Sequence, residues 1–304
     1  MRTMDITDAR TFIAVAEAGS ISRAARELHL TQPAVTRRIQ RLEHAIGARL
    51  IDRRKRPFAL TDVGQAAIER CRRLVSTRDE LKALAQGGAA LPTRECRIGV
   101  AHALTEIALT QPVDDLLDSF PAVVLRLATG WSRDLAERVR SGALDAAVVL
   151  LPRADGLPAG VTGRDLGTEQ LQIIASRARH SRQPTLKELA TSGWILNPEG
   201  CAARATLQKV LAKAGLPLRV GVETYNYELQ MSLVARGRGF GLVPSRLVSK
   251  SAARAALSVL DVRALDFPMT VWLLTTELPS ALQAALNTFA GSLERRLAPK
   301  RSGK

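Results

Sequence analysis

The sequence predicts an α+β protein of several domains: a helical N-terminal domain, a long linker helix and a C-terminal α/β domain of two lobes. Three observations predict this arrangement. Short helical patterns with clear capping residues fill the first 50 positions, one longer helical pattern follows, and from Leu91-Pro92 onward strand and helix patterns alternate. A chain of 304 residues is long enough for two or three domains that each bury a core.

The first two helices are marked by the residues at their ends. An apolar stripe of helical period runs through 6–18, and Gly19 is placed to end that helix in a left-handed conformation. Ser20 can cap a second helix over 21–28, and His29-Leu30 then forms a short turn.

The third helix has a polar outer face. Thr31 caps it, Pro33 is tolerated in its first turn, and Gly47 closes it. Its apolar stripe, which we expect to pack inward, is formed by Val35, Ile39, Leu42 and Ile46. The outer positions are Gln32, Thr36, Arg37, Gln40 and Arg41, whose side chains suit base edges and phosphates in a major groove. The second and third helices are short and joined by a turn, and the third carries side chains that can contact bases. This arrangement predicts a helix-turn-helix.

A basic hairpin follows the third helix. The segments 50–53 and 58–61 can pair as strands around Arg54-Lys55-Arg56-Pro57. Such a wing places arginine on phosphates or in the minor groove, and the alternative is a basic surface hairpin without a partner. The winged helix-turn-helix domain is therefore expected over 1–62.

The net charge of +15 favours a polyanionic partner. Between Arg23 and Arg56 there are ten Lys or Arg residues against three acids. Any one of these arginines could belong to an ordinary solvated helix face. Their clustering around a capped helix with polar readers favours double-stranded DNA.

The next segment predicts a linker helix for dimerisation over 63–90. Thr61 can cap it and Gly87-Gly88 end it. A weak heptad-like seam, interrupted by Arg78, is formed by Ala67, Cys71, Leu74, Leu81 and Ala85. We interpret Cys71 as a small apolar residue of that seam.

Strands and helices alternate over the rest of the chain, 91–304, which predicts a parallel sheet with helices on its faces. One continuous helix is expected over 104–120. The order of the patterns suggests two lobes, one of about 91–161 and 267–304 and the other of about 162–266. A ligand cleft is expected between the lobes at the strand ends.

Three predicted helices begin at this cleft, and their free N–H groups favour a carboxylate ligand. Trp131 could stack on an aromatic or other apolar-bodied acid, or it could be an ordinary rim or core aromatic. The candidate ligand contacts from these helix starts are His102, Ala103, Leu104, Thr105, Gly130, Trp131, Ser132, Pro198 and Cys201.

The N-terminal residues resemble those of LysR-type transcriptional regulators. The match is dense over roughly the first 65 positions and includes Gly19-Ser20-Ile21-Ser22, Leu30–Thr36 and Leu42-Glu43; Thr36 stands where Ser is usual, and Ile51-Asp52 where Phe-Glu is usual. The resemblance implies base contacts from the start of the third helix and a minor-groove arginine at Arg56. The candidate DNA contacts are Thr31, Gln32, Pro33, Thr36, Arg37, Arg41, Arg53, Arg54, Lys55 and Arg56.

The second half resembles the effector-binding domain of the same family, which is similar to periplasmic binding proteins. Motifs such as Arg97-Ile98-Gly99, Gly142–Asp145 and Val234–Pro244 carry this likeness. It implies a cleft lined by Ala103, Leu104, Trp131, Ser132, Asn197, Cys201 and Glu223. Peroxide sensors of the family carry a reactive cysteine near Cys201. A helix N-terminus would favour its thiolate, but no resolving cysteine follows nearby.

Several other classes of protein and site find no support in the sequence. No apolar run is long enough for a membrane span or a signal peptide, so a cytoplasmic protein is expected. The cysteines Cys71, Cys96 and Cys201 suit neither a disulfide framework nor a zinc site. The four histidines lack paired spacing, and catalytic and nucleotide fingerprints are absent, so no enzyme, metal or cofactor is expected.

The sequence thus predicts a DNA-binding transcriptional regulator that responds to a small organic acid. Its expected partners are double-stranded DNA, that effector, a second copy of itself in a homodimer or homotetramer, and RNA polymerase. The alternative is a small-ligand-binding protein whose DNA binding is architectural and independent of the effector.

Overall fold

The chain folds, in the computed structural model, as two compact units, one of Met1–Arg94 with Ser141–Ala143 and one of Glu95–Arg140 and Leu144–Lys304. We call them the N-terminal and C-terminal units and describe each by itself. The structure describes residues 5–52, 59–85, 94–153, 155–179, 183–262, 267–276, 278 and 280–298. Of the helices in these ranges, none is long and apolar enough to cross a membrane.

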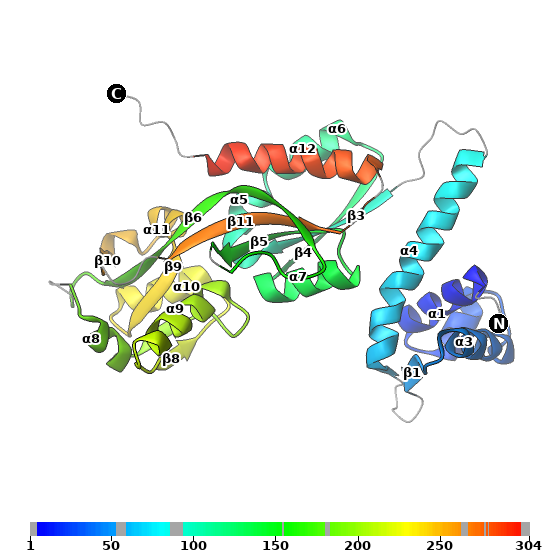
Figure 1. Ribbon diagram of the computed structural model, residues 1–304, viewed down its shortest axis with the longest axis horizontal. Helices are drawn as coiled ribbons and strands as arrows, with labels where there is room; N and C mark the ends of the chain where they lie inside the picture. The colour runs from blue at the N-terminus through cyan, green and yellow to red at the C-terminus, as the bar shows by residue number, and fades with distance from the viewer. Residues whose placement is uncertain are drawn as a thin grey trace. The chain divides into compact units, whose positions relative to one another are not determined.

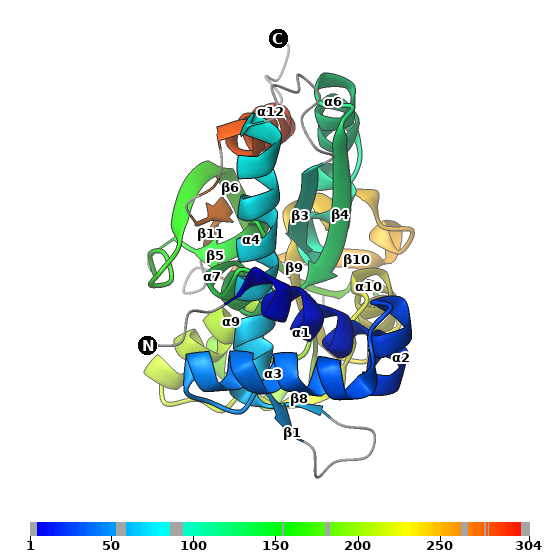
Figure 2. The same cartoon turned by 90° about the vertical axis from the view of Figure 1, so that its right-hand side faces the viewer.

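The N-terminal unit is a helix-turn-helix followed by a two-stranded hairpin and a long helix (Figure 2). The strands of the hairpin are antiparallel, with Ile51 opposite Leu60. Its elements are α1 (Ile6–Ala18), α2 (Ile21–Glu27), α3 (Gln32–Ile46), β1 (Ile51–Asp52), β2 (Ala59–Leu60) and α4 (Asp62–Ala85).

The expected caps are confirmed. Gly19 and Gly47 both adopt left-handed conformations, with φ of 62° and 77°. The Ser20 hydroxyl accepts from Arg23 N at 3.4 Å, and the Thr31 hydroxyl accepts from Ala34 N at 3.4 Å. These local signals fix where α2 and α3 begin, and so which face of α3 is turned outward.

The core of this unit joins α4 to the helix-turn-helix. Ala67 and Cys71 of α4 are buried in one cluster with Phe12, Val35 and Leu42. The expected seam is therefore wrong in part, because Ala67 and Cys71 pack within their own chain, whereas Leu74 and Leu81 are exposed. The inward position expected for Ile46 is also wrong: this residue is 38% exposed, since it is the last of α3, beyond the packed part of the stripe.

The C-terminal unit is built on one mixed sheet of nine strands. The strands follow the order β4-β3-β5-β11-β6-β9-β7-β8, and β10 pairs with β6. In lobe I, α6 (Gln111–Ser119) and α12 (Ser280–Leu297) lie over one face and α7 (Ser132–Ser141) over the other (Figure 1). The strands are β3 (Arg94–Ala101), β4 (Val123–Gly130), β5 (Ala146–Pro152), β6 (Thr162–Ser176), β7 (Trp194–Leu196), β8 (Val220–Glu223), β9 (Phe240–Pro244), β10 (Leu257–Leu260) and β11 (Pro268–Thr275).

The prediction of a parallel sheet is wrong for its centre. The β3–β5, β7–β8 and β7–β9 pairs are parallel, as βαβ crossovers require. β11, however, runs antiparallel to both β5 and β6, and β6 runs antiparallel to β9 and β10. These pairings join segments far apart in the chain, which strand patterns alone do not reveal.

Strand β6 belongs to both lobes. Its first part, from Thr162 to Gln170, pairs with β11, and its second part, from Leu171, pairs with β9 in lobe II. The helices of lobe II are α8 (Leu186–Thr191), α9 (Ala202–Lys213), α10 (Tyr227–Ala235) and α11 (Ser245–Lys250), and the turn η2 (Arg254–Ala256) precedes β10.

The helix expected over 104–120 is broken. A 3₁₀ turn, η1 (His102–Leu104), is followed by α5 (Thr105–Ala108) and then by α6. Pro112 lies in the first turn of α6, where its missing N–H is tolerated, and it cannot continue a helix from α5 because its ring would clash with the preceding turn. The break allows η1 to end beside the cleft between the lobes.

Candidate functional site

The outer face of α3 is free to bind. Pro33, Thr36, Arg37 and Gln40 lie on one side of the helix, away from the buried Val35. Gln32, Arg37 and Gln40 are exposed. Within the described ranges, the side chains of Gln32, Thr36, Arg37 and Gln40 have no hydrogen bond or ion pair. A face of free amide, hydroxyl and guanidinium groups can read base edges.

Arg41 and Arg38 lie nearer to α1 and are engaged there. The Arg41 guanidinium donates to both carboxylate oxygens of Asp8, at 3.0 and 2.5 Å, and this interaction raises the pKa of Arg41. Arg38 Nη1 donates to Thr11 Oγ1 at 3.3 Å. Asp8 is buried, so Arg41 neutralises a buried charge as well as standing among the predicted DNA contacts.

The hairpin beside α3 is anchored by two contacts. Glu43 of α3 accepts from the backbone N–H groups of Leu50 and Ile51 at 2.9 and 3.3 Å. Leu50 O in turn accepts from Thr61 N at 3.0 Å, where α4 begins. These bonds place the hairpin between α3 and α4. The four predicted wing contacts, Arg53, Arg54, Lys55 and Arg56, lie outside the described residues.

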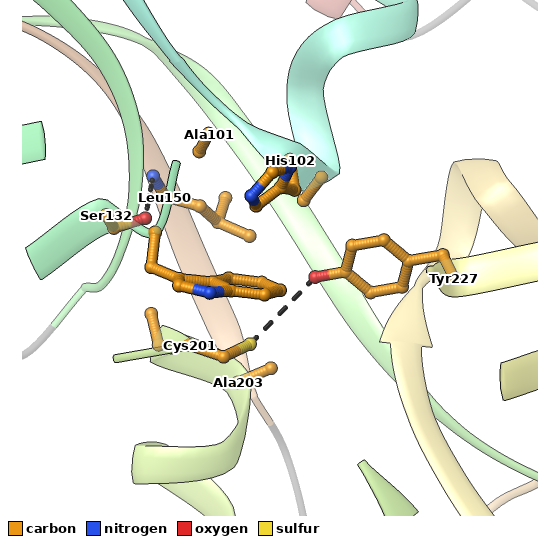
Figure 3. A pocket seen from close by; sticks show the side chains of 10 residues that line it. Ala101, His102, Ser132, Leu150, Cys201, Ala203 and Tyr227 are labelled. Carbon is orange, nitrogen blue, oxygen red and sulfur yellow. Dashed lines mark hydrogen bonds between the residues drawn. The ribbon is translucent and has the colours of Figure 1, made fainter. Parts of the chain in front are cut away.

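A pocket lies between the two lobes of the C-terminal unit (Figure 3). Lobe I contributes η1, the start of α7 and the end of β5, and lobe II contributes the starts of α9 and α10. Its cavity volume is about 10 Å³, close to that of a single water molecule. The lining residues are Ala101, His102, Ala103, Trp131, Ser132, Leu150, Cys201, Ala202, Ala203 and Tyr227.

Trp131 fills much of the space between the lobes. Its ring lies 4.6 Å from that of His102 and 6.1 Å from that of Tyr225, measured between centroids. Its Cβ also packs against Gly200, where an added side-chain carbon would lie only 3.4 Å away. Partial burial lowers the pKa of His102, which favours the neutral imidazole. The pocket wall is thus aromatic and uncharged.

Two side-chain hydroxyl groups lie at the N-termini of helices beside the pocket. The Ser132 hydroxyl, at the start of α7, accepts from Leu150 N at 3.1 Å and retains its own hydrogen (Figure 3). The Tyr227 hydroxyl lies 3.9 Å from Cys201 Sγ. Both groups face the pocket, and none of the ten lining residues carries a carboxylate. Such a lining can accept an anionic oxygen without repulsion.

Cys201 does not have the lowered pKa expected of a thiol at a helix N-terminus. The backbone N–H groups of Arg204 and Ala203 and the Tyr227 hydroxyl favour its thiolate, but burial outweighs them and raises the pKa. The Tyr227 phenol is likewise raised well above its usual pKa by burial. Cys201 is 4% exposed, so the geometry describes a packed thiol.

We expect all three cysteines to be inert in the native protein. Burial raises the pKa of Cys71 and Cys201, and it raises that of Cys96 to about 12. At pH 8 a thiol with that pKa is about one part in ten thousand thiolate. A disulfide reagent such as DTNB should therefore titrate no thiol in buffer and three in denaturant. Rapid loss of one thiol in the native protein, abolished by Cys201→Ala, would restore the sensor hypothesis.

The other predicted ligand contacts are not among the residues that line this pocket. Leu104 is fully buried in the core, Gly130 ends β4 against Leu135, and the Thr105 hydroxyl donates to His102 O at 3.1 Å. Asn197 Nδ2 donates to Thr224 O at 2.9 Å, and Pro198 is buried beside it.

Glu223, the last of these residues, is exposed and pairs with Arg204 at 2.6 Å. These six residues stay predictions as ligand contacts. Sequence reasoning missed five lining residues. Ala101, Ala202 and Ala203 adjoin predicted contacts, whereas only the fold brings the segments of Leu150 and Tyr227 to the cleft.

Two family models match the chain. The model described as "Bacterial regulatory helix-turn-helix protein, lysR family" matches residues 6–65, and the model described as "LysR substrate binding domain" matches residues 89–298. The regulator TfdS of Cupriavidus pinatubonensis is 32% identical over 259 residues, which cover 81% of this chain and 84% of TfdS.

Two solved structures share the fold. ArgP of Mycobacterium tuberculosis has a TM-score of 0.72 at 24% identity and covers 96% of this chain and 98% of its own. CbnR in complex with its target DNA has a TM-score of 0.60 at 20% identity, with coverage of 97% and 100%.

Proposed function

Because this chain belongs to the LysR family of transcriptional regulators, we propose that it reads its operator with the outer face of α3 and responds to an organic acid bound between its two lobes. The observation that carries the first part is the exposed polar face of α3, whose Gln32, Thr36 and Arg37 have no partner among the described side chains. The DNA complex of CbnR, a protein of the same fold, supports it.

We propose one role for each of the three predicted segments of the chain. We assign DNA binding to residues 1–62, linkage and dimerisation to 63–90, and effector binding to 91–304. On α4 the exposed apolar residues Val63, Leu74 and Leu81 share one side, because spacings of 7 and 11 residues return to the same face of a helix. A second copy of the chain would cover this stripe, and RNA polymerase is the further partner that a regulator requires.

The second part rests on the pocket. Ser132 and Tyr227 offer hydroxyl hydrogens, the α7 and α9 starts offer backbone N–H groups, and Trp131 and His102 offer aromatic surface. A carboxylate on an apolar body suits this combination. Because about 10 Å³ holds no such molecule, binding must move Trp131 or open the lobes. That requirement couples occupancy of the pocket to the lobe geometry.

Replacing Arg37 by alanine should relax base preference. An arginine bound bidentately to guanine contributes about 1–3 kcal/mol of discrimination, or about 5- to 150-fold in affinity between operator and mutated site. The measurement is a binding titration on a library of operator variants. Arg41→Ala is compared for stability only: it should lower the thermal stability of the N-terminal unit by leaving the buried Asp8 unpaired, whereas Arg37→Ala should leave that stability unchanged. A wild-type specificity profile for Arg37→Ala would remove it from the readers.

The effector is tested by footprinting the full-length protein on fragmented host DNA with a panel of small carboxylic acids. Under the proposal, discrete sites appear and their protection shifts with one acid, and Ser132→Ala weakens that response. Footprints that no acid changes would instead favour the alternative of architectural, effector-independent DNA binding.

A further inference from the structure

We propose that the end of lobe II opposite the cleft is a second DNA-binding surface, which holds backbone phosphates outside the stretch read by α3. Six exposed arginines from four segments gather there, and we call this surface the basic tip. Its members are Arg177, Arg179, Arg219, Arg236, Arg238 and Arg254. The proposal rests on the proposed reading of DNA by α3 and is independent of the identity of the effector.

The strand directions bring these arginines to one end. Parallel strands β7 and β9 run toward the cleft, so their first residues, Trp194 and Phe240, lie at the opposite end. Arg219 precedes β8, and its carbonyl accepts from Trp194 N at 2.8 Å. Phe240 N donates to Gly193 O at 3.1 Å, which places Arg238 beside the same edge.

The other four arginines join this edge through β6, which ends here because it runs antiparallel to β9. Ser176 Oγ donates to Ala235 O at 2.9 Å. Arg177 and Arg236, the next residue after each of these two, are therefore close in space. The Arg179 side chain lies against Gly237, and Arg177 N donates to Ala256 O at 2.9 Å, next to the Arg254 turn. Figure 1 shows β10 and α8 at this end of the unit.

No described acidic side chain is paired with the arginines of the basic tip. Among the residues that the structure describes, none of the six guanidinium groups forms an ion pair. The acid of the adjacent helix α8, Glu188, is engaged in a capping box, with its Oε2 2.7 Å from Thr185 N. Six like charges at one end of the lobe repel one another, and a polyanion would relieve that repulsion.

The chemistry of the tip fits phosphates better than a protein partner. Guanidinium groups bind phosphate oxygens through paired N–H donors. Protein interfaces are centred on buried aromatic anchors, yet the exposed tyrosine of lobe II, Tyr225, lies beside Trp131 at the cleft. DNA is also the partner nearest to the basic tip. Because the same chain would bind DNA through α3, the effective concentration of DNA for the tip would be high.

The test compares full-length wild-type protein with a variant carrying Arg219→Gln, Arg238→Gln and Arg254→Gln. Two duplexes are used: one limited to the footprint of the winged domains, and one extended on each side by about four helical turns, or about 42 base pairs. On the long duplex, the slope of log affinity against log salt should become shallower by about 2.7 for each bound tip. That change corresponds to about a 40-fold smaller loss of affinity between about 50 and 200 mM salt. The short duplex should show no change.

A matched control removes the same charge from lobe I through Arg126→Gln, Arg153→Gln and Arg296→Gln. It should retain the wild-type slope on the long duplex, and circular dichroism should show wild-type folding for both variants. Equal slopes for the tip variant and wild type on the long duplex would overturn the proposal. So would unchanged DNA binding together with weaker binding to purified RNA polymerase, which would assign the tip to an acidic protein surface.

Discussion

Replacing Glu169 by alanine is expected to lower the free energy of unfolding of the C-terminal unit by about 3 kcal/mol. The Glu169 side chain, on the shared strand β6, is only 3% exposed. It accepts from Arg246 Nε and, at 3.0 Å, from Ser245 Oγ. Removing it leaves a largely buried guanidinium without its counter-ion, and Arg246 Nη2 already has no hydrogen-bond partner among the described residues. Such an unpaired charge is costly because little water reaches it.

Differential scanning calorimetry of the full-length protein measures this effect. For a unit of this size the expected loss corresponds to a fall of about 6–12 °C in the Tm of the C-terminal transition. Ser245→Ala removes one neutral donor only and should cost about 1 kcal/mol. Glu169→Gln keeps one acceptor oxygen but loses the charge and the second acceptor, and its effect should lie between the two. A C-terminal transition unchanged by Glu169→Ala would mean that the ion pair contributes nothing net.

Replacing Gly64 by alanine should destabilise the N-terminal unit by about 3 kcal/mol, the upper part of the range for overpacking. Gly64 lies in the first turn of α4, where an alanine would ordinarily favour the helix by up to about 1 kcal/mol. Here the added carbon would lie 2.1 Å from Leu50 O, a backbone atom already held by Thr61 N. The clash therefore outweighs the gain in helix propensity, and α4 must move away from the hairpin.

The measurement is urea unfolding of the full-length protein followed by a probe in the N-terminal unit, with operator affinity measured alongside. Gln65→Ala, at the exposed neighbouring position, is the control and should leave stability within about 0.5 kcal/mol of wild type. Gly64→Ala should also weaken operator binding, since the hairpin is fixed to the same contact. Wild-type stability for Gly64→Ala would show that α4 shifts at no cost.

The helix-turn-helix could be predicted almost residue by residue because its signals are local. Gly19, Ser20, Thr31 and Gly47 each act within three or four residues of their own position, and all four caps are confirmed. The mixed sheet could not be predicted in the same way. Whether β11 runs parallel or antiparallel depends on β5 and β6, whose residues lie more than 90 positions away.

In the candidate site, too, local sequence signals located some residues, whereas contacts between distant residues could not be predicted. His102, Trp131, Ser132 and Cys201 line the pocket because they follow strand ends, which a sequence pattern can locate. Nothing near Arg41 in the sequence reveals Asp8, 33 positions earlier, so its ion pair could not be foreseen. The pKa of Cys201 departs from the expected direction for a related reason, since burial depends on packing from both lobes whereas a helix start is visible in the sequence.

The position of β11 in the sheet also determines when lobe I can complete its folding during synthesis. β11 lies between β5 and β6 at the centre of lobe I, yet its residues, Pro268–Thr275, come long after both of these strands in the chain. The ribosome adds about 5–20 residues per second, so the roughly 115 residues that separate β5 from β11 take about 6–23 s to make. During that time β5 has an open edge able to pair with another chain. The N-terminal unit can fold early, whereas lobe I stays open to misassembly until β11 has been made.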